Sequence, residues 1–399
     1  MKFKTLKATI LCTLFAVAVF SCKNDNGTWL VETTSDPITI EKVVNPVQYD
    51  APITGAVLEQ LIKVVGKNLA NTVSVFVNDV EVEMPMYANV VNGILYVRIP
   101  YQAPIVVDNK IKITDKYGNV AEVSDFTVAL PDMVAKGPAG SMEWVAPGET
   151  LTISGDYFDL YRITDTTGGS VKIGTLNAPI VNMTKTQLEV LVPNGALANS
   201  DITIISETGA TVVCKNRYRD GRWLLGDFND KGFVTNGRWT YQGGTDDEND
   251  PTDPTDPAPI DGIYLKYKAS YPGGWSGDTW GVYRVNNSPN VPEDINTNRT
   301  AYNFKFEAWA YLPPGPAIRF EFEGEASEVR VWWWGAIGLP GGTTDLYPAA
   351  PVLNVWQTVT IPAELINPGP ITTTFQMVAH GPDACEMYVA IDNPRFELK

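Results

Sequence analysis

Two nine-residue stretches, IKVVGKNLA at 62–70 and LTISGDYFD at 151–159, decide how this chain is organised. In each of them, apolar residues at alternate positions lead into a glycine, Gly66 in the first and Gly155 in the second. Alternation over a few residues is the pattern of a half-buried β-strand, and a glycine inside such a run marks a bulge or a close backbone approach. The two stretches therefore predict the same strand in two copies of one module.

The same order continues after each stretch. ILYVRIP at 94–100 matches QLEVLVP at 187–193, and both runs end on proline. IKITDKYGN at 111–119 then matches ITIISETGA at 202–210. Blocks that recur in one order at nearly one spacing are the signature of an internal repeat. We therefore expect two successive β modules.

These modules resemble the TIG (IPT) domain, an immunoglobulin-like β-sandwich. The resemblance rests on the apolar strand, the Gly-x-x turn that leads to an aromatic or aliphatic residue, the strand that ends in proline and the hairpin with glycine. It assigns one TIG-like domain to residues 36–131 and another to residues 132–218. It implies that both act as spacers, and only Trp144 among the 11 tryptophans of the chain falls inside them.

The rest of the chain also predicts strands. After residue 21, short alternating runs are separated by turns, and no long apolar pattern at helical spacing occurs. The chain has 33 glycines and 29 prolines, residues that favour the turns between such runs. This is the pattern of an all-β protein.

The first residues predict export. Three lysines among the first seven residues precede an apolar run at 8–20, as in a secretory signal. The sequence VFSC that follows resembles the lipobox of bacterial lipoproteins. This resemblance implies a signal peptide over 1–21, lipidation of Cys22 and an N-terminal linker over 22–35. An ordinary cleaved signal followed by a stray cysteine is the alternative.

Charge and cysteine content narrow the function. The formal net charge is −16, and it becomes −19 when residues 1–21, with three lysines and no acid, are removed. A field of this sign repels phosphate-rich partners, so we expect no nucleic-acid binding. Cys214 and Cys385 lie in different predicted domains, so no disulfide is expected between them. No C-x-x-C pair occurs, and the sequence gives no support for a zinc site.

Residues 219–399 form the third predicted domain. Nine of the 11 tryptophans lie there, at 223, 239, 275, 280, 309, 332, 333, 334 and 356. The segments LLGDFND, GRWTYQGG and YVAIDNPRFEL resemble parts of jelly-roll carbohydrate-binding modules, which implies a jelly-roll-like β-sandwich. We expect the acidic, proline-rich stretch at 245–259 to be a solvated insertion, because its regularly spaced prolines prevent a compact calcium cage.

Period-two alternation sorts the side chains of this domain into two faces. The expected core residues are Phe304, Phe306, Ile318, Phe320, Phe322, Val329, Val331, Trp333, Phe375, Met377 and Ala379. The expected outer face carries Lys305, Glu307, Trp309, Tyr311, Arg319, Glu321, Arg330, Trp332, Trp334, Gln376 and His380. Alternation thus divides the three consecutive tryptophans, with Trp333 in the core and its two neighbours on the outer face, beside Trp309 if their strands are neighbours.

A face that mixes rings with long polar side chains suits a sugar. The apolar C–H face of a pyranose lies flat on an aromatic ring, while its hydroxyls take hydrogen bonds from polar side chains. The candidate glycan-binding residues are Trp332, Trp334, Trp309, Trp275, Trp280, Tyr283, Arg330, Glu321, Gln376 and His380. For each ring, the alternative is a tryptophan or tyrosine that packs in the core or in a loop.

Two other site types are weighed. Glu321, Glu323 and Glu325 alternate in FEFEGE and resemble the acidic strand of jelly-roll glucanases, but the central residue there is Asp, so a solvated charged strand is favoured over a hydrolase. A structural calcium ion between Asp227 and Asp392 is a second hypothesis, against which carboxylates that cap turns are favoured. No other cofactor is expected.

The architecture as a whole resembles the surface glycan-binding proteins of Bacteroidota polysaccharide utilisation loci. The resemblance implies a lipid-anchored protein on the surface of the outer membrane. Its third domain would hold a polysaccharide without cleaving it, near a TonB-dependent importer. A β-glucan such as β-1,3-glucan, mixed-linkage glucan or xyloglucan is the implied ligand. An adhesin or scaffold that binds a partner protein through the same aromatic surface is the rival hypothesis.

Overall fold

The computed structural model describes residues 35–399 apart from some gaps. The gaps are 165, 167, 230–233, 236–238, 243–253, 275–277, 285–289, 313–316, 323–327, 332–344, 347–351, 367–368 and 372–373. In the described residues the regular elements are β-strands and short 3-10 turns, which confirms the all-β prediction. No helix in this part of the chain has the length and apolar character needed to cross a membrane.

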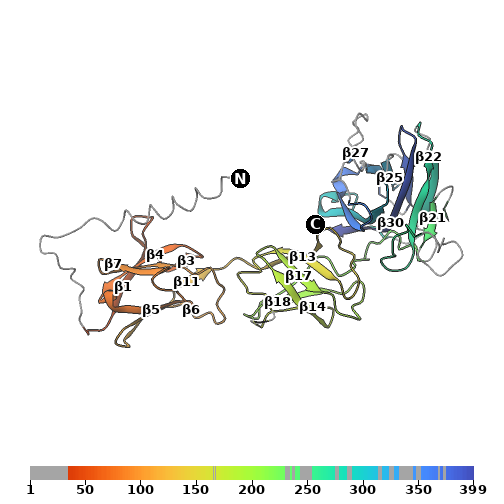
Figure 1. Cartoon of the computed structure of the whole chain (residues 1–399). Helices are drawn as coiled ribbons and strands as arrows, with labels where there is room; N and C mark the ends of the chain where they lie inside the picture. The colour runs from red at the N-terminus through yellow and green to blue at the C-terminus, as the bar shows by residue number, and fades with distance from the viewer. Residues whose placement is uncertain are drawn as a thin grey trace, which may run out of the picture. The chain divides into compact units, whose positions relative to one another are not determined.

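The chain divides into two compact units, Met1–Leu130 and Pro131–Lys399. The first unit holds one β-sandwich, drawn in red and orange in Figure 1. The second unit holds two further sandwiches, which run from yellow through green to blue. Each unit is described separately below.

The first unit is built from two main sheets. One has the order β2 (Ala51–Pro52), β1 (Thr39–Asn45), β4 (Leu61–Lys67), β8 (Ile94–Arg98) and β7 (Ala88–Val91). The other has the order β10 (Val120–Val123), β9 (Ile111–Asp115), β5 (Thr72–Val77) and β6 (Val80–Glu81). A parallel pair, β11 (Thr127–Ala129) and β3 (Gly55–Val57), and the turn η2 (Leu69–Asn71) complete it. Alternate residues of both sheets form one buried aliphatic core around Val64, Val75, Leu95 and Ile113.

The first sandwich of the second unit has the same plan. One sheet has the order β12 (Val134–Ala139), β13 (Thr150–Asp156), β17 (Gln187–Leu191) and β16 (Ile180–Met183). The other has the order β15 (Leu176–Ala178), β14 (Ser170–Ile173), β18 (Ile202–Ile205) and β19 (Thr211–Val213). The repeated sequence blocks form equivalent strands, because β13 and β17 pair with each other as β4 and β8 do.

The glycine of each repeat lies where two strands come too close for a side chain. Gly66 is opposite Ile40 on β1, and a Cβ on it would lie 1.9 Å from the carbonyl oxygen of Thr39. Gly155 is opposite Ala135 on β12, and a Cβ on it would lie 2.1 Å from the carbonyl oxygen of Val134. Both contacts adjoin a β-bulge, so the glycine is required by the packing of the two strands.

The third domain is also a sandwich. The six-stranded sheet has the order β20 (Val234–Thr235), β23 (Asp278–Arg284), β29 (Thr374–His380), β25 (Ala317–Glu321), β26 (Glu328–Val331) and β27 (Asp345–Leu346). The sheet that faces it, called here the covered sheet, has the order β21 (Trp239–Gln242), β22 (Tyr264–Tyr271), β30 (Cys385–Leu398), β24 (Tyr302–Ala310) and β28 (Gln357–Pro362). The turns η3 (Arg299–Ala301) and η4 (Ala363–Leu365) lie in the same domain.

The core between these sheets confirms the predicted alternation. It contains Phe304, Phe306, Ile318, Phe320, Phe322, Phe375, Met377 and Ala379, all of them buried. The rings of Phe304 and Phe306 contact that of Phe320 at centroid distances of 5.1 and 4.5 Å. The predicted core residue Trp333 lies outside the described residues.

The outer face of the covered sheet carries a second apolar cluster. It consists of Tyr264, Trp309, Tyr388 and Ala390, with Trp356 packed against it. Residues 256–258 lie on this cluster. The carboxylate of Asp256 accepts hydrogen bonds from Lys266 Nζ at 2.8 and 2.9 Å and another from the hydroxyl of Tyr388. The carbonyl oxygen of Ala258 accepts a hydrogen bond from Trp356 Nε1 at 2.9 Å.

This packing corrects the expectation of a solvated insertion for the end of that stretch. Residues 256–258 are tied to the sheet through a charged pair and backbone carbonyls, and Pro257 is buried. Residues 245–253 of the predicted insertion lie outside the described residues. The proline spacing gave no indication that residues 256–258 dock on the sheet.

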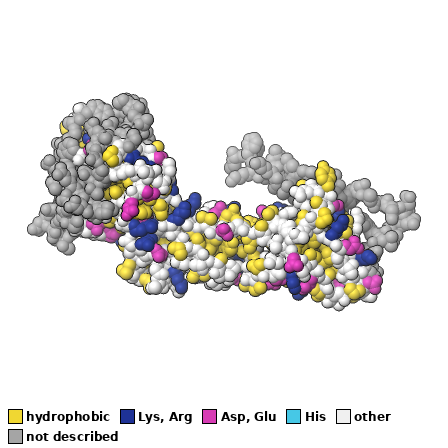
Figure 2. Space-filling view, turned by 180° about the vertical axis from the view of Figure 1, so that it is seen from behind, with side chains coloured by type: hydrophobic (Ala, Val, Ile, Leu, Met, Phe, Trp, Pro, Cys, Tyr) yellow, Lys and Arg dark blue, Asp and Glu magenta, His cyan; other side chains and the backbone are white. Residues whose placement is uncertain are grey.

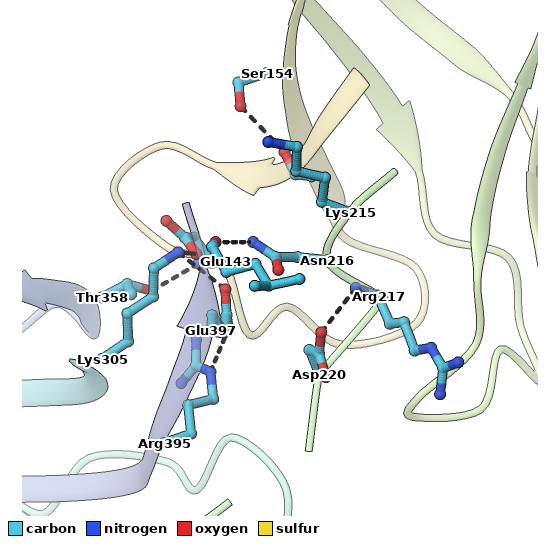
Figure 3. A network of polar contacts seen from close by, with 12 residues as sticks. Glu143, Ser154, Lys215, Asn216, Arg217, Asp220, Lys305, Thr358, Arg395 and Glu397 are labelled. Atoms are coloured by element: carbon cyan, nitrogen blue, oxygen red, sulfur yellow. Dashed lines mark hydrogen bonds and ion pairs between the residues drawn. The ribbon is translucent and has the colours of Figure 1, made fainter. Parts of the chain in front are cut away.

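The TIG-like domain of the second unit is joined to the third domain by buried charges (Figure 3). Lys305 Nζ of β24 lies 2.6 Å from Glu143 Oε2 and 3.0 Å from Glu397 Oε2. Arg395 Nε donates to Glu397 Oε1 at 2.6 Å, and its Nη1 donates to Glu307 Oε2 at 2.8 Å. These five side chains alternate in charge along the row, so each buried charge has a partner of the opposite sign.

No disulfide joins Cys214 and Cys385, as predicted. Burial raises the pKa of the Cys214 thiol to about 12. This thiol is therefore inert at neutral pH.

Candidate functional site

The six-stranded sheet brings six of the predicted site residues onto four neighbouring strands. Trp280 and Tyr283 lie on β23, Gln376 and His380 on β29, Glu321 on β25 and Arg330 on β26. These strands are adjacent in the order β23-β29-β25-β26, although about a hundred residues separate the first from the last in sequence. The sheet therefore assembles a site that the linear sequence does not show.

The strand register sets which positions face each other. Glu321 is opposite Gln376, and Arg319 is opposite Val378 on one side and Arg330 on the other. Trp280 is also opposite Val378, from the far side of β29. Directly opposed residues in a sheet lie about 5 Å apart, within reach of each other's side chains.

A polar row runs across this face. Arg319 Nη2 lies 2.6 Å from Glu321 Oε1, and Gln376 Nε2 donates to Glu321 Oε2 at 2.5 Å. Arg319 and Glu321 are only 5% and 3% exposed, whereas Gln376 is half-buried. The Glu321 carboxylate is thus held between a cation and an amide, and its charge is balanced by Arg319.

Sequence reasoning placed Arg319 on this face but did not include it in the site. The available signal was its position two residues before Glu321, because residues two apart on a strand share a face. Arg319 is opposite Arg330 on the neighbouring strand, and its guanidinium neutralises the carboxylate of Glu321 on its own strand.

Several predicted site residues cannot be placed in full. Trp275, Trp332 and Trp334 lie outside the described residues, as do Glu323 and Glu325. For Trp280, Tyr283, Arg330 and His380 the structure describes the strand position but not the side chain. Tyr283 is opposite Phe375, a residue of the core.

Trp309 lies in the other sheet from the remaining predicted site residues that the structure describes. Its strand, β24, belongs to the covered sheet and does not neighbour β26. The side chain is 5% exposed, and its ring packs edge-on against Tyr388 at a centroid distance of 5.2 Å. The condition for Trp309 to lie beside Arg330, that their strands are neighbours, is therefore not met, because period-two alternation gives the face of a strand but not the sheet it joins.

In the described part of the chain, the candidate calcium ligands Asp227 and Asp392 do not belong to a cluster of metal-binding side chains. Asp392 is 1% exposed, and burial raises its pKa well above the ordinary value, with a further rise from the nearby Asp261 and Glu307. Among the residues that the structure describes, no three His, Cys, Asp or Glu side chains come together in a way that could hold a metal ion. The structure thus offers no described third ligand to accompany Asp227 and Asp392.

Comparison with known proteins bears on these observations. Residues 140–216 match the IPT/TIG domain family. A surface glycan-binding protein of Prevotella bryantii is similar in structure, with a TM-score of 0.53 at 19% identity over 91% of this chain and 99% of that one. The chain has the fold of a surface glycan-binding protein.

A second solved structure agrees. It is a protein crystallised with a xylogluco-oligosaccharide, with a TM-score of 0.51 at 14% identity over 92% of this chain and 80% of that one. No curated protein matches the sequence. The likeness therefore extends across both units of the chain while the identity stays low, so it establishes the shared fold.

Proposed function

We propose that this protein binds a polysaccharide without cleaving it, through the outer face of the six-stranded sheet. The observation that carries the proposal is the assembly of five predicted glycan-binding residues, Trp280, Gln376, His380, Glu321 and Arg330, on one face of four adjacent strands, around the row Arg319–Glu321–Gln376. The sixth, Tyr283, is opposite the core residue Phe375, so the register places it on the other face. The fold of surface glycan-binding proteins supports it.

The chemistry of the face fits a neutral sugar. The half-buried Gln376 has both donor and acceptor groups that can bind sugar hydroxyls, while Glu321 and Arg319, which are 3% and 5% exposed, hold its amide in place. A ring that covers a pyranose face and removes on the order of 100 Å² of apolar surface from water contributes about 2 kcal/mol. Two or three such rings, less the cost of ordering, give micromolar to millimolar affinity, which repetition along a polymer strengthens.

The ligand that we propose is a β-glucan, of the xyloglucan, mixed-linkage or β-1,3 type. The similar structure that contains a xylogluco-oligosaccharide supports this class. The formal charge of −16 also disfavours polyanionic glycans such as sulfated ones. On the exposed surface of Figure 2, basic and acidic side chains are interspersed, and no broad basic field is visible.

Lipidation of Cys22 would hold the protein on the outer surface of the outer membrane, where it could present the glycan to a TonB-dependent importer. This part of the proposal rests on the signal-like residues 1–22, which lie outside the described residues.

The polar row favours binding over hydrolysis. A glycosidase needs two carboxyl groups that reach the scissile bond, whereas Glu321 is 3% exposed and is held by Arg319 at 2.6 Å and by Gln376. Release of reducing ends that is lost in Glu321→Gln would restore the hydrolase hypothesis.

Affinity electrophoresis in gels that contain soluble polysaccharides tests the binding face. We expect Trp332→Ala, Trp334→Ala and Gln376→Ala to lose retardation in the gel that retards the wild-type protein. Tyr311→Ala is the matched control, because Tyr311 is 39% exposed but follows β24 of the covered sheet. If no glycan retards the wild-type protein, the rival hypothesis of an adhesin that binds a partner protein is favoured instead. If the three variants migrate like the wild type, the face lies elsewhere.

A further inference from the structure

The first unit contains a groove of about 280 Å³ whose lining is unusual for a spacer. Its walls include Tyr87, Tyr101, Arg98, Gln102, Glu59 and Glu83. Tyr87 is 45% exposed and Tyr101 is 38% exposed. Two tyrosine rings that open onto one groove beside donors and acceptors are not needed to hold a β-sandwich together.

The backbone fixes both sides of this groove. Tyr101 follows the end of β8, and Tyr87 immediately precedes β7, the strand that pairs with β8. The amide of Arg98 donates to the carbonyl oxygen of Tyr87 at 2.7 Å, and the amide of Tyr87 donates to that of Glu83 at 2.9 Å. The segments that carry the two tyrosines are therefore held in place before any ligand arrives, which lowers the entropic cost of binding.

The second TIG-like domain shows what the fold itself requires at these positions. There the amide of Leu191 donates to the carbonyl oxygen of Pro179 at 2.8 Å. Leu191 thus has the position of Arg98, and Pro179 has the position of Tyr87. The strand register agrees, because Ala88 is opposite Val97 in the first copy and Ile180 is opposite Val190 in the second.

At two more positions of the groove, the first and second TIG-like domains also have different residues. The amide of Glu59 donates to the carbonyl oxygen of Ile99, and in the second copy Gly148 donates to that of Val192. Alignment of the prolines that end the repeated strands places Asn194 where the first copy has Tyr101. The second copy thus folds with Pro, Leu, Gly and Asn at these sites, so this fold does not by itself require Tyr, Arg, Glu and Tyr there.

The charge of the groove limits its ligand. Arg98 Nη2 is paired with Glu59 Oε1 at 3.3 Å, while Glu81 and Glu83 add two more carboxylates to the lining. The negative excess repels uronate or sulfate groups, whereas the carboxylates can accept hydrogen bonds from hydroxyls. The exposed phenol rings provide the flat apolar surface on which a pyranose stacks.

We propose that this groove is a second binding site for a neutral polysaccharide, on the first TIG-like domain. The chain then holds a glycan at two places, one in each unit, and the first domain is more than a spacer. Linked sites raise the apparent affinity for a polymer without any new contact at either site.

Hydroxyl-radical footprinting of the mature full-length chain tests this site separately from the third domain. With xyloglucan, mixed-linkage glucan or β-1,3-glucan present, we expect Tyr87 and Tyr101 to be oxidised several-fold more slowly. Tyr117, which is 48% exposed on the β9–β10 turn of the same domain, should not be protected. A carboxymethylated form of the same glucan should protect none of the three.

A variant that takes the residues of the second copy completes the test. Arg98→Leu with Tyr101→Asn should keep the melting temperature of the first unit near the wild-type value, lose the protection of Tyr87 and lower polymer affinity about tenfold. Protection of Tyr87 and Tyr101 that persists when Trp332→Ala and Trp334→Ala are introduced supports this site even if the third domain does not bind. Absence of protection by every neutral glycan, or protection only by a partner protein, overturns it.

Discussion

Lys305 Nζ, on the third domain, lies 2.6 Å from Glu143 Oε2, on the preceding TIG-like domain, and both side chains are buried. A second contact lies close by, where Trp144 Nε1 donates to Asp261 Oδ2 at 2.7 Å. The backbone amide of Thr358 also donates to the carbonyl oxygen of Ser141 at 2.8 Å. The TIG-like domain of the second unit is thus an integral support of the third domain.

The first prediction concerns this junction. Glu143→Ala leaves the buried ammonium of Lys305 without one of its two carboxylates, and we expect the free energy of unfolding of the second unit to fall by about 3–5 kcal/mol. Urea unfolding followed by tryptophan fluorescence measures it. Asp201→Ala is the control, because its pair with Arg217 is exposed and should cost less than about 1 kcal/mol. Equal effects of the two substitutions would contradict the structural role of Glu143.

The second prediction concerns the glycines of the repeat. Gly66→Ala and Gly155→Ala place a methyl group about 2 Å from a carbonyl oxygen of the next strand, so each should destabilise its own domain by at least about 2 kcal/mol. Thermal unfolding with limited proteolysis identifies which domain is lost. Gly221→Ala should have a small effect, because its Cβ would meet only side-chain atoms of Asn199, at 3.3 Å or more. Wild-type stability of either repeat variant would show that these strands can move apart.

The third prediction is a pH dependence confined to the first unit. Burial would raise the pKa of Asp115, but hydrogen bonds from the side chain and backbone of Asn119 and from the amide of Tyr117 outweigh it and lower the pKa. A carboxylate with a lowered pKa stabilises the fold above its ordinary pKa, and this stability is lost as the pH falls through the lowered value. In the second copy a hydroxyl, Ser206, accepts the matching hydrogen bond from the amide of Ala210 at 3.0 Å.

The repeat therefore supplies its own control substitution. Asp115→Ser should destabilise the first unit at pH 7 and have a smaller effect at pH 3, because pH 3 lies below the ordinary pKa of aspartate and proton uptake then favours the unfolded wild-type chain. Thermal unfolding of both proteins at the two pH values measures the difference. A destabilisation that is the same at pH 3 and pH 7 would mean that the charge of Asp115 contributes nothing.

Much of the fold could be predicted from the sequence, because its two signals act locally. Alternation of apolar residues depends only on the pleat of a strand, and it gave the buried side of Phe304, Phe320 and Phe375 correctly. The repeat predicted that Gly66 and Gly155 are equivalent, and both lie at the same kind of close contact between two strands.

The rest depends on contacts between distant segments. Alternation placed Trp309 away from the core, but it could not show that β24 joins the covered sheet or that residues 256–258 lie on its outer face. It placed Lys305 on the same outer face without showing that Glu143 reaches it from another domain. Tyr87 and Tyr101 lie just outside strands, where no period marks a side chain as buried or exposed, so alternation could not indicate that they line one groove.

The central claim is that the mature chain holds a neutral β-glucan and leaves it intact. Isothermal titration of the full-length chain with xylogluco-, mixed-linkage and laminari-oligosaccharides, followed by chromatography of the same samples, tests it most directly. We predict saturable heat with at least one of the three, a loss of about tenfold or more in affinity for Gln376→Ala, and an unchanged oligosaccharide profile. No heat with any of them, or the appearance of shorter oligosaccharides, would contradict the account.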